Sequence, residues 1–289
     1  MNETVKFKTT RDNWTLIITP QRKWFDLHLG ELWRYRDLVM LFVRRDFVAS
    51  YKQTILGPLW YPIQPIISTI IFTIVFGNIA RLPTDGSPAF LFYMAGNTMW
   101  NYFSSCLMDT SKTFIGNVSI FGKVYFPRLS VPVSLMISNL IAFAIRFGVF
   151  LAFWIYFLLM GVGIHPNAWI LLLPVQLLIM AGLGLGLGIT LSSMTVKYRD
   201  LQQLLGFGVQ LLMYATPIIY PLSTVKGIWR WMILANPMTA VVETFRLGFL
   251  GVGTINPLWL CYSTLLMLIM LFLGLLLFNH VEASFMDTV

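Results

Sequence analysis

The chain has 289 residues, of which 57% are hydrophobic and 11% charged, and its mean hydropathy of +0.74 excludes a soluble globular domain. Several apolar runs are long enough to cross a bilayer, so the sequence predicts an all-α, polytopic membrane protein with one membrane domain. The net charge of +8 would suggest a nucleic-acid partner in a soluble protein. In a membrane protein it follows from Lys and Arg in cytoplasmic loops, and we expect no nucleic-acid binding.

The amino-terminal region divides into a polar arm and a helix at the membrane surface. Residues 1–30 are polar, lack the early apolar core of a signal peptide, and are expected to form a cytoplasmic arm. Residues 31–57 are predicted to be an amphipathic interface segment, helical over 31–52 and ended by Gly57-Pro58. On a helical wheel, one side carries Arg34, Asp37, Arg44, Arg45 and Lys52, and the other carries Leu32, Val39, Val43 and Phe47.

Six membrane-spanning helices follow, within a transmembrane domain at residues 58–279. They are predicted at 59–79, 89–109, 131–160, 168–196, 201–220 and 257–278. Lys and Arg gather before the first span and in the loops after the second and fourth spans, so these segments and both termini are expected to be cytoplasmic. Residues 280–289 are then a cytoplasmic tail, and residues 222–251 lie on the extracytoplasmic side.

One extracytoplasmic stretch is apolar yet too short to cross a membrane. It begins at Asn236-Pro237, runs for about three helical turns and stops at Gly251. Glu243 and Arg246 are three residues apart and so share a helix face. The stretch is either part of a re-entrant helical hairpin, which needs surrounding protein or water at membrane depth, or an amphipathic helix on the outer surface.

No residues have the spacing of a catalytic or metal site. The three histidines are far apart, and both cysteines lie inside apolar runs. The string from Gly116 to Lys123 fails the phosphate-binding loop pattern, because five residues separate its glycines and Val124 follows the lysine. We therefore expect a non-catalytic chain that binds no cofactor, and any energy from ATP must come from a partner.

Arg146 lies near the middle of the third span, where a buried cation is costly unless it is paired or hydrated. Three interpretations stay open from the residues alone. Arg146 pairs with Glu243, lines a pore for an anionic substrate, or extends its side chain to the membrane surface.

Glycine and aromatic residues are concentrated in the spans. Gly182, Gly184, Gly186 and Gly188 are spaced so that two adjacent helix faces permit close contact with neighbouring helices. Aromatic residues near span ends and polar patches belong to the interfacial belt and core, or line a path for sugar rings. These channel candidates are Trp60, Tyr61, Tyr93, Trp100, Tyr102, Phe103, Tyr214 and Tyr220, with Arg146.

Four short motifs occur in order along the chain. The first is residues 37–60, with Arg44-Arg45-Asp46-Phe47 and Leu56-Gly57-Pro58-Leu59-Trp60, and the second runs from Lys123 to Arg128. The third combines Tyr198-Arg199-Asp200-Leu201 with residues 214–221, and the fourth runs from Asn236-Pro237 to Gly251. In a six-span chain with this orientation, they resemble the permease subunits of type-2 ABC exporters for cell-surface polysaccharides, namely O-antigen, group 2 capsule and teichoic acid.

The resemblance implies a homodimer in the cytoplasmic (inner) membrane, joined by two copies of a separate ATPase that uses ATP and Mg²⁺. Residues 111–128 would be a coupling loop rather than an ordinary loop, with Asn117, Ile120, Phe121, Lys123, Tyr125, Phe126 and Arg128 coupling it to the ATPase. Arg34, Arg44, Arg45 and Lys52 would receive the head group of a lipid-linked glycan, although a basic interfacial helix binds anionic membrane lipid equally well. The re-entrant pair would include Asn236, Pro237, Glu243 and Arg246.

The resulting hypothesis is ATP-driven export of a lipid-linked polysaccharide, with O-antigen first and capsule or teichoic acid next. One alternative is a type-2 ABC exporter of a small lipid or drug, which would be expected to lack the many aromatic residues and the long basic helix. Another is an ion-coupled secondary transporter, which normally has acidic residues at mid-span and an internal repeat. A glycan-modifying enzyme is disfavoured because no acid/base constellation is present.

Overall fold

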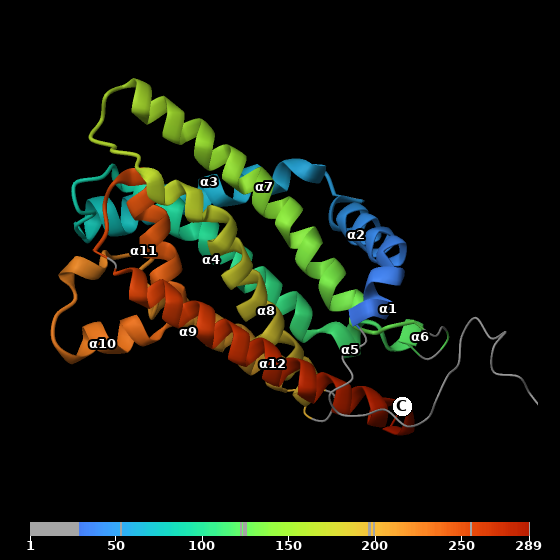
Figure 1. The fold of residues 1–289 in the computed structure, drawn as a ribbon. Helices are drawn as coiled ribbons and strands as arrows, with labels where there is room; N and C mark the ends of the chain where they lie inside the picture. The colour runs from blue at the N-terminus through green and yellow to red at the C-terminus, as the bar shows by residue number, and fades with distance from the viewer. Residues whose placement is uncertain are drawn as a thin grey trace, which may run out of the picture.

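The computed structural model describes residues 29–288 apart from residues 53, 122, 124, 125, 196, 197, 199 and 255, so the arm predicted at 1–30 lies outside it except for residues 29 and 30, which begin α1. Over this range the chain is all helical, as predicted, and the described part contains no strand. Long helices run side by side between two ends of the molecule (Figure 1). The start of α1 and the end of α12 lie at the same end (Figure 1).

The elements fall into three groups. Those at the end that holds the start of α1 are α1 (Leu29–Arg34), α2 (Arg36–Tyr51), η2 (Gly57–Leu59), α5 (Thr113–Gly116) and α6 (Val118–Phe121). The long helices are α3 (Trp60–Phe72, continued by the π-helical η3, Thr73–Ile79), α4 (Ala89–Ser111), α7 (Ser130–Leu159), α8 (Leu173–Thr195, preceded by η4, Ala168–Leu172), α9 (Leu201–Tyr214) and α12 (Pro257–Thr288). The opposite end holds η5 (Leu222–Thr224), α10 (Ile228–Ala235) and α11 (Pro237–Leu250).

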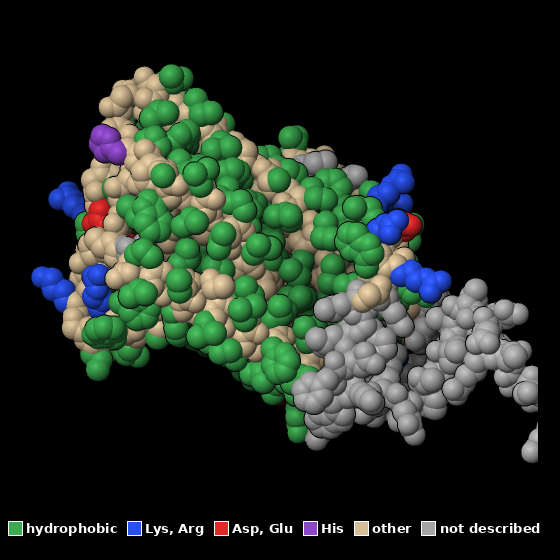
Figure 2. Space-filling view, in the orientation of Figure 1, with side chains coloured by type: hydrophobic (Ala, Val, Ile, Leu, Met, Phe, Trp, Pro, Cys, Tyr) green, Lys and Arg blue, Asp and Glu red, His purple; other side chains and the backbone are tan. Residues whose placement is uncertain are grey.

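Four helices of the described chain are long and apolar enough to cross a membrane, at Trp60–Ile79, Ser130–Leu159, Ala168–Thr195 and Pro257–Val281. They match the first, third, fourth and sixth predicted spans. Apolar side chains cover the visible face between two ends that carry the Lys and Arg side chains (Figure 2). The chain is therefore an integral membrane protein, and the spans predicted at 89–109 and 201–220 stay predictions.

Two predicted boundaries are wrong, and the coupling loop predicted at 111–128 contains two single helical turns, α5 and α6. The interface helix is two helices, α1 and α2, which meet at Tyr35, and α2 ends at Tyr51. The helix predicted over 201–220 ends at Tyr214, ahead of two prolines that lack a backbone N–H and disfavour helix in the preceding residue.

Helix α4 is the centre of the bundle. It packs against α7 and α8 along its length and also contacts α3, α9 and α11. Every residue from Leu91 to Trp100 is buried. Because protein rather than lipid surrounds α4, its polar side chains are tolerated at a depth where an outer helix would have to be apolar.

The glycines of α8 bring this helix close to α4 and α12, as predicted. A Cβ atom added at Gly184 would lie 2.6 Å from Cys106 Cβ on α4. One added at Gly186 would lie 2.6 Å from Leu271 N and 2.7 Å from Met270 C on α12. There is no room for a Cβ atom at either glycine, so the helices approach this closely only because α8 has glycine there. Helices α4, α8 and α12 therefore form a tightly packed block.

Gly186→Ala is expected to force α8 and α12 apart, because the added methyl would overlap backbone atoms that cannot move aside. We expect a loss of about 1–3 kcal/mol, the usual cost of overpacking, measured as a lower melting temperature in detergent. Gly208→Ala on α9 is the matched control, since no atom lies within 4 Å of its added Cβ. Equal melting temperatures for the two variants would contradict the close contact.

Candidate functional site

Five buried phenylalanines form a cluster where the interface helix, the predicted coupling segment and the last helix meet. Phe42 of α2 contacts Phe126, with ring centroids 5.6 Å apart, and Phe126 contacts Phe121 of α6 at 5.7 Å. Phe114 of α5 lies 6.0 Å from Phe121 and 4.8 Å from Phe278 of α12. All five are at most 6% exposed. We call them the coupling cluster, because they join α2 to the segment at 111–128.

The coupling cluster also decides which predicted coupling residues face outward. Phe121 and Phe126 are buried in it, and Arg128 is buried with its guanidinium carbon 5.6 Å from the centre of the Phe121 ring. These three side chains hold the segment to the body of the protein. Of the other predicted coupling residues, Asn117 and Ile120 are half-buried, Lys123 is exposed, and Tyr125 lies outside the described residues.

Helix α2 turns its charged side outward and its apolar side toward α7, as predicted. Val39, Phe42 and Val43 are buried. Arg45 forms an ion pair with Asp46, with 2.7 Å between Nη2 and Oδ1, and its guanidinium lies 4.7 Å from the centre of the Phe42 ring. The exposed members of the predicted entrance set are Arg34, Arg44, Arg45 and Lys52.

Hydrogen-bonded amides that were not predicted from the sequence connect α4 to α3 and α7. Asn101 Nδ2 donates to Asn97 Oδ1 at 2.8 Å, and Asn97 Nδ2 donates to Ser68 Oγ of α3 at 2.6 Å. Further along α4, Asp109 Oδ2 accepts a hydrogen bond from Asn139 of α7 at 2.9 Å. We call these five residues the polar seam. The available sequence signal was the spacing of four between Asn97 and Asn101, which places both amides on one helix face.

Arg146 lies on the inner face of α7. It is 9% exposed, and it shares that face with the buried Phe143 and Phe150. The predicted pairing of Arg146 with Glu243 is wrong, because Glu243 pairs with Arg246 and the groups that act electrostatically on Arg146 are Tyr61 and Asp109. Arg146 therefore belongs with the polar seam and not with α11.

Arg246 of α11 joins three segments through a guanidinium that is only 1% exposed. Its Nη1 lies 3.5 Å from Glu243 Oε1 and donates to Pro217 O. Its Nη2 donates to Ile218 O at 2.6 Å and to Phe92 O at 3.3 Å, and the group lies 3.5 Å from the centre of the Phe92 ring. Arg246 thus ties α11 to the start of α4 and to the chain that follows α9.

The backbone groups at both ends of α11 are bonded to protein. At its start, Asn236 Oδ1 accepts from Met238 N at 3.0 Å, while Asn236 Nδ2 donates to Thr216 Oγ1 at 2.8 Å. At its end, the carbonyls of residues 247–250 all accept hydrogen bonds, whose donors are Asn167 Nδ2 (2.8 Å), Asn167 N (3.0 Å), Trp154 Nε1 (2.7 Å) and His165 N (3.3 Å). A helix with its termini satisfied in this way needs no water at either end.

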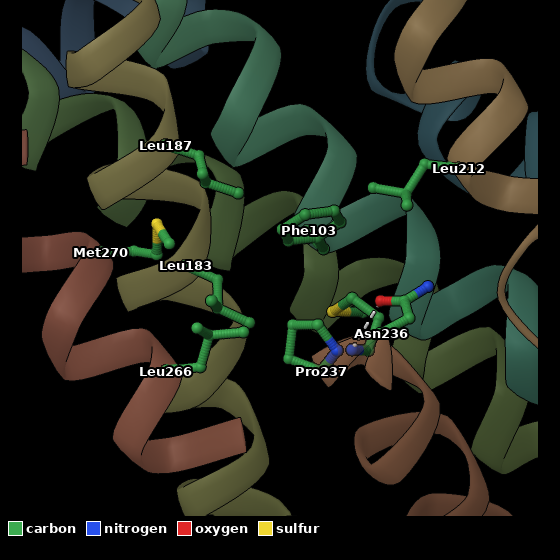
Figure 3. A pocket seen from close by; sticks show the side chains of 9 residues that line it. Phe103, Leu183, Leu187, Leu212, Asn236, Pro237, Leu266 and Met270 are labelled. Carbon is green, nitrogen blue, oxygen red and sulfur yellow. Dashed lines mark hydrogen bonds between the residues drawn. The ribbon is translucent and has the colours of Figure 1, made fainter. Parts of the chain in front are cut away.

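An apolar cavity of about 170 Å³ lies beside the turn between α10 and α11. Figure 3 shows it between Leu183 and Leu187 of α8, Leu212 of α9, and the Asn236–Pro237 turn. Side chains from α8, α9 and α12 therefore do not fill the space between these helices beside the turn between α10 and α11. The cavity marks α9 as less tightly packed than the block of α4, α8 and α12.

The sequence profile of the ABC-2 type transporter family matches residues 37–250, which include α2 from its second residue, the coupling cluster except Phe278, the polar seam and α11. The chain belongs to the ABC-2 type transporter family. It is 25% identical over 252 residues to the O-antigen export system permease protein RfbA of Klebsiella pneumoniae, across 87% of this chain and 94% of that protein. A protein of the same name from Myxococcus xanthus is 29% identical over 221 residues, across 76% of this chain and 82% of the relative. The inner membrane transport permease YadH of Escherichia coli K12 is 22% identical over 214 residues, across 73% and 83% of the two chains.

In this ABC-2 permease the predicted channel aromatics divide by burial. Tyr61 is half-buried and stacks on Phe47 of α2, with centroids 6.1 Å apart, and the half-buried Tyr220 donates to Tyr214 O at 3.0 Å. Trp60 and Tyr214 are about half exposed, at 50% and 49%. Those packed into the core are Tyr93, Trp100, Tyr102 and Phe103.

Arg246→Leu is expected to destabilise the permease by about 3–5 kcal/mol, because it leaves the Glu243 carboxylate buried without its cation and removes the donor to the Pro217 and Ile218 carbonyls. The measurement is the melting temperature and yield of the purified protein. Adding Glu243→Gln should recover part of the loss, whereas Lys226→Leu, at an exposed outer position, should change little. Independent, additive effects of the two changes would show that the pair is not coupled.

Proposed function

We propose that this ABC-2 permease is the membrane subunit of an ATP-driven exporter of lipid-linked polysaccharide, with O-antigen as the first candidate and capsule or teichoic acid next. The observation that carries the proposal is the coupling cluster. Through it, a partner that moves residues 111–128 would also move the basic interface helix α2. The substrate class is supported by the relatives whose names state O-antigen export.

The energy source in this proposal is a separate ATPase. ABC-2 permeases normally work with such a partner, and the described residues hold no cluster that could bind a metal ion. Two copies of this chain would pair and join two ATPase subunits, which would bind ATP and Mg²⁺. The face toward the ATPase would include the exposed Lys123 at the tip of the coupling segment.

The proposed membrane arrangement has six spans, with α2, α5, α6 and both termini in the cytoplasm. Helix α4 has 23 residues, about 35 Å of helix, which is enough to cross the hydrocarbon layer although it is too polar to face lipid. Helix α9, with 14 residues, would complete its crossing through the chain at 215–220 that Arg246 holds. Helices α10 and α11 would then be the re-entrant pair, since the ends of α11 are bonded to protein.

The transport step follows from this arrangement. ATP binding by the partner would displace α5 and α6, and Phe126 would carry that displacement to Phe42 and α2. Helix α2 would shift at the cytoplasmic entrance, where its exposed arginines meet the phosphate groups of lipids through charge-assisted hydrogen bonds. The glycan would then pass outward along the permease dimer.

A small-lipid or drug exporter of the same family is the second candidate. It is favoured by the match to YadH, whose name states transport without a polysaccharide. Both candidates use the coupling cluster in the same way, so only the substrate separates them.

Loss of this chain from its own bacterial cell should remove polysaccharide from the surface and cause lipid-linked glycan to accumulate inside. The measurement is the amount of surface polysaccharide beside the amount of intracellular lipid-linked glycan, with a plasmid copy of the chain as the control. Normal amounts of both, in a cell without a second exporter, would overturn the polysaccharide assignment and leave the small-molecule exporter.

Phe42→Leu is expected to uncouple α2 from the coupling segment while keeping the site apolar, at a cost in stability below about 1.5 kcal/mol. We expect surface polysaccharide to fall about fivefold or more, the effect of losing a typical coupling energy, with the amount of permease in the membrane unchanged. Leu41→Ala is the matched control, because Leu41 is the neighbouring residue on α2 and is 62% exposed. Export by Phe42→Leu equal to that of Leu41→Ala would argue against the cluster as a coupling path.

A further inference from the structure

We propose that Arg146, beside the polar seam, binds the phosphate or diphosphate of the carrier lipid while that lipid is in transit through the permease. The inference rests on the proposed export of a lipid-linked glycan. It assigns a binding site to a residue outside both the entrance helix and the coupling cluster.

Arg146 is a buried cation without a protein partner. The residue is 9% exposed, and within the described residues Arg146 forms no hydrogen bond and no ion pair. By contrast, Arg246 has four partners. A lone buried cation in a membrane span costs several kcal/mol, and such residues line substrate or water paths. The chain nevertheless has a buried arginine at this position, which indicates that a partner outside the chain pairs with its charge.

The surroundings of Arg146 do not already neutralise it. Its nearest acidic group, Asp109, is beyond the 4 Å of an ion pair and accepts a hydrogen bond from Asn139 instead. Tyr61 also acts on Arg146 electrostatically, and its ring stacks on Phe47 of α2. The guanidinium therefore lies next to the junction of the entrance helix with α3, α4 and α7.

The nitrogens of Arg146 are not sealed off. The Nε atom of Arg246 is enclosed without a partner, whereas none of the Arg146 nitrogens is enclosed in this way. An anion that entered between α3 and α7 would meet a planar guanidinium, which binds phosphate through two parallel hydrogen bonds. This geometry favours an oxyanion over a neutral sugar hydroxyl.

The depth of Arg146 selects the kind of phosphate. It is the seventeenth residue of the 30-residue α7, about 24 Å along a helix of about 45 Å. The phosphates of resting membrane lipids lie outside a hydrocarbon core about 30 Å thick, whereas Arg146 is buried inside the protein beside α2 and α3. A transported lipid that passes α2 would bring its phosphate to Arg146, whereas a resting phospholipid would have to leave the headgroup layer, so we infer the transported lipid.

The test is equilibrium binding of radiolabelled undecaprenyl diphosphate to the full-length permease in phosphatidylcholine nanodiscs, with labelled phosphatidylglycerol in parallel. We expect Arg146→Gln to weaken undecaprenyl diphosphate binding about tenfold or more and Arg146→Lys to weaken it less, because lysine keeps the charge but loses the planar pair of donors. Phosphatidylglycerol binding should be unchanged in both variants. Lys226→Gln, which removes one exposed positive charge, is the control for net charge.

Asp109→Asn separates this proposal from a water-bridged pair between Arg146 and Asp109. The proposal expects binding that is unchanged or tighter, since a competing negative charge is removed. Equal losses of binding and of melting temperature in Arg146→Gln and Asp109→Asn would overturn it in favour of an internal pair. Unchanged binding by Arg146→Gln, or an equal loss for phosphatidylglycerol, would overturn it while leaving the export proposal intact. Failure of the wild-type protein to bind undecaprenyl diphosphate would count against both.

Discussion

The need to satisfy polar groups that are buried inside the bundle is the constraint on which this fold depends. It acts most clearly at α11, a helix of 14 residues that is too short to cross a membrane and yet almost wholly buried. Its four last carbonyls are bonded by α7 and the chain after it, and its first turn is capped by Asn236. Nη1 and Nη2 of Arg246 donate to carbonyls outside α11, so the charge that makes the helix unfit for lipid also fixes its position.

The same constraint explains why the most polar long helix is central. Helix α4 carries Asn97, Asn101 and Asp109, and its hydropathy does not qualify it as a span. Helices α3, α7 and α8 enclose the buried half of α4 and separate it from lipid. The polar side chains of α4 form hydrogen bonds with residues of α3 and α7. The polar seam is tolerated inside the bundle because its side chains are bonded to one another rather than left without partners.

Local signals predicted much of this from the sequence, and long-range pairing was what they missed. Hydrophobic length gave four spans, helical periodicity gave the two faces of α2, and glycine spacing gave the two contact faces of α8. The predicted pairing of Arg146 with Glu243 was wrong because Glu243 pairs with Arg246, which lies three residues further along the same helix. Burial decided the role of Phe121, Phe126 and Arg128, since a short loop with basic and aromatic residues does not reveal which side chains turn inward.

Packing divides the molecule into a rigid part and movable parts. The glycines of α8 lock α4, α8 and α12 into one block, because helices that approach so closely do not slide past one another without first separating. Helix α2 rests on α7 and on the coupling cluster, whereas α9 packs on α4 and α8 beside a cavity and turns Leu204, Phe207 and Leu211 outward. Motion driven from residues 111–128 in the proposed exporter would therefore be easiest at α2 and α9, while Arg246 holds the chain that follows α9 to α11. In the proposed exporter, a path would open by movement of these two helices around a fixed block, with Arg146 and the polar seam on the side that α2 uncovers.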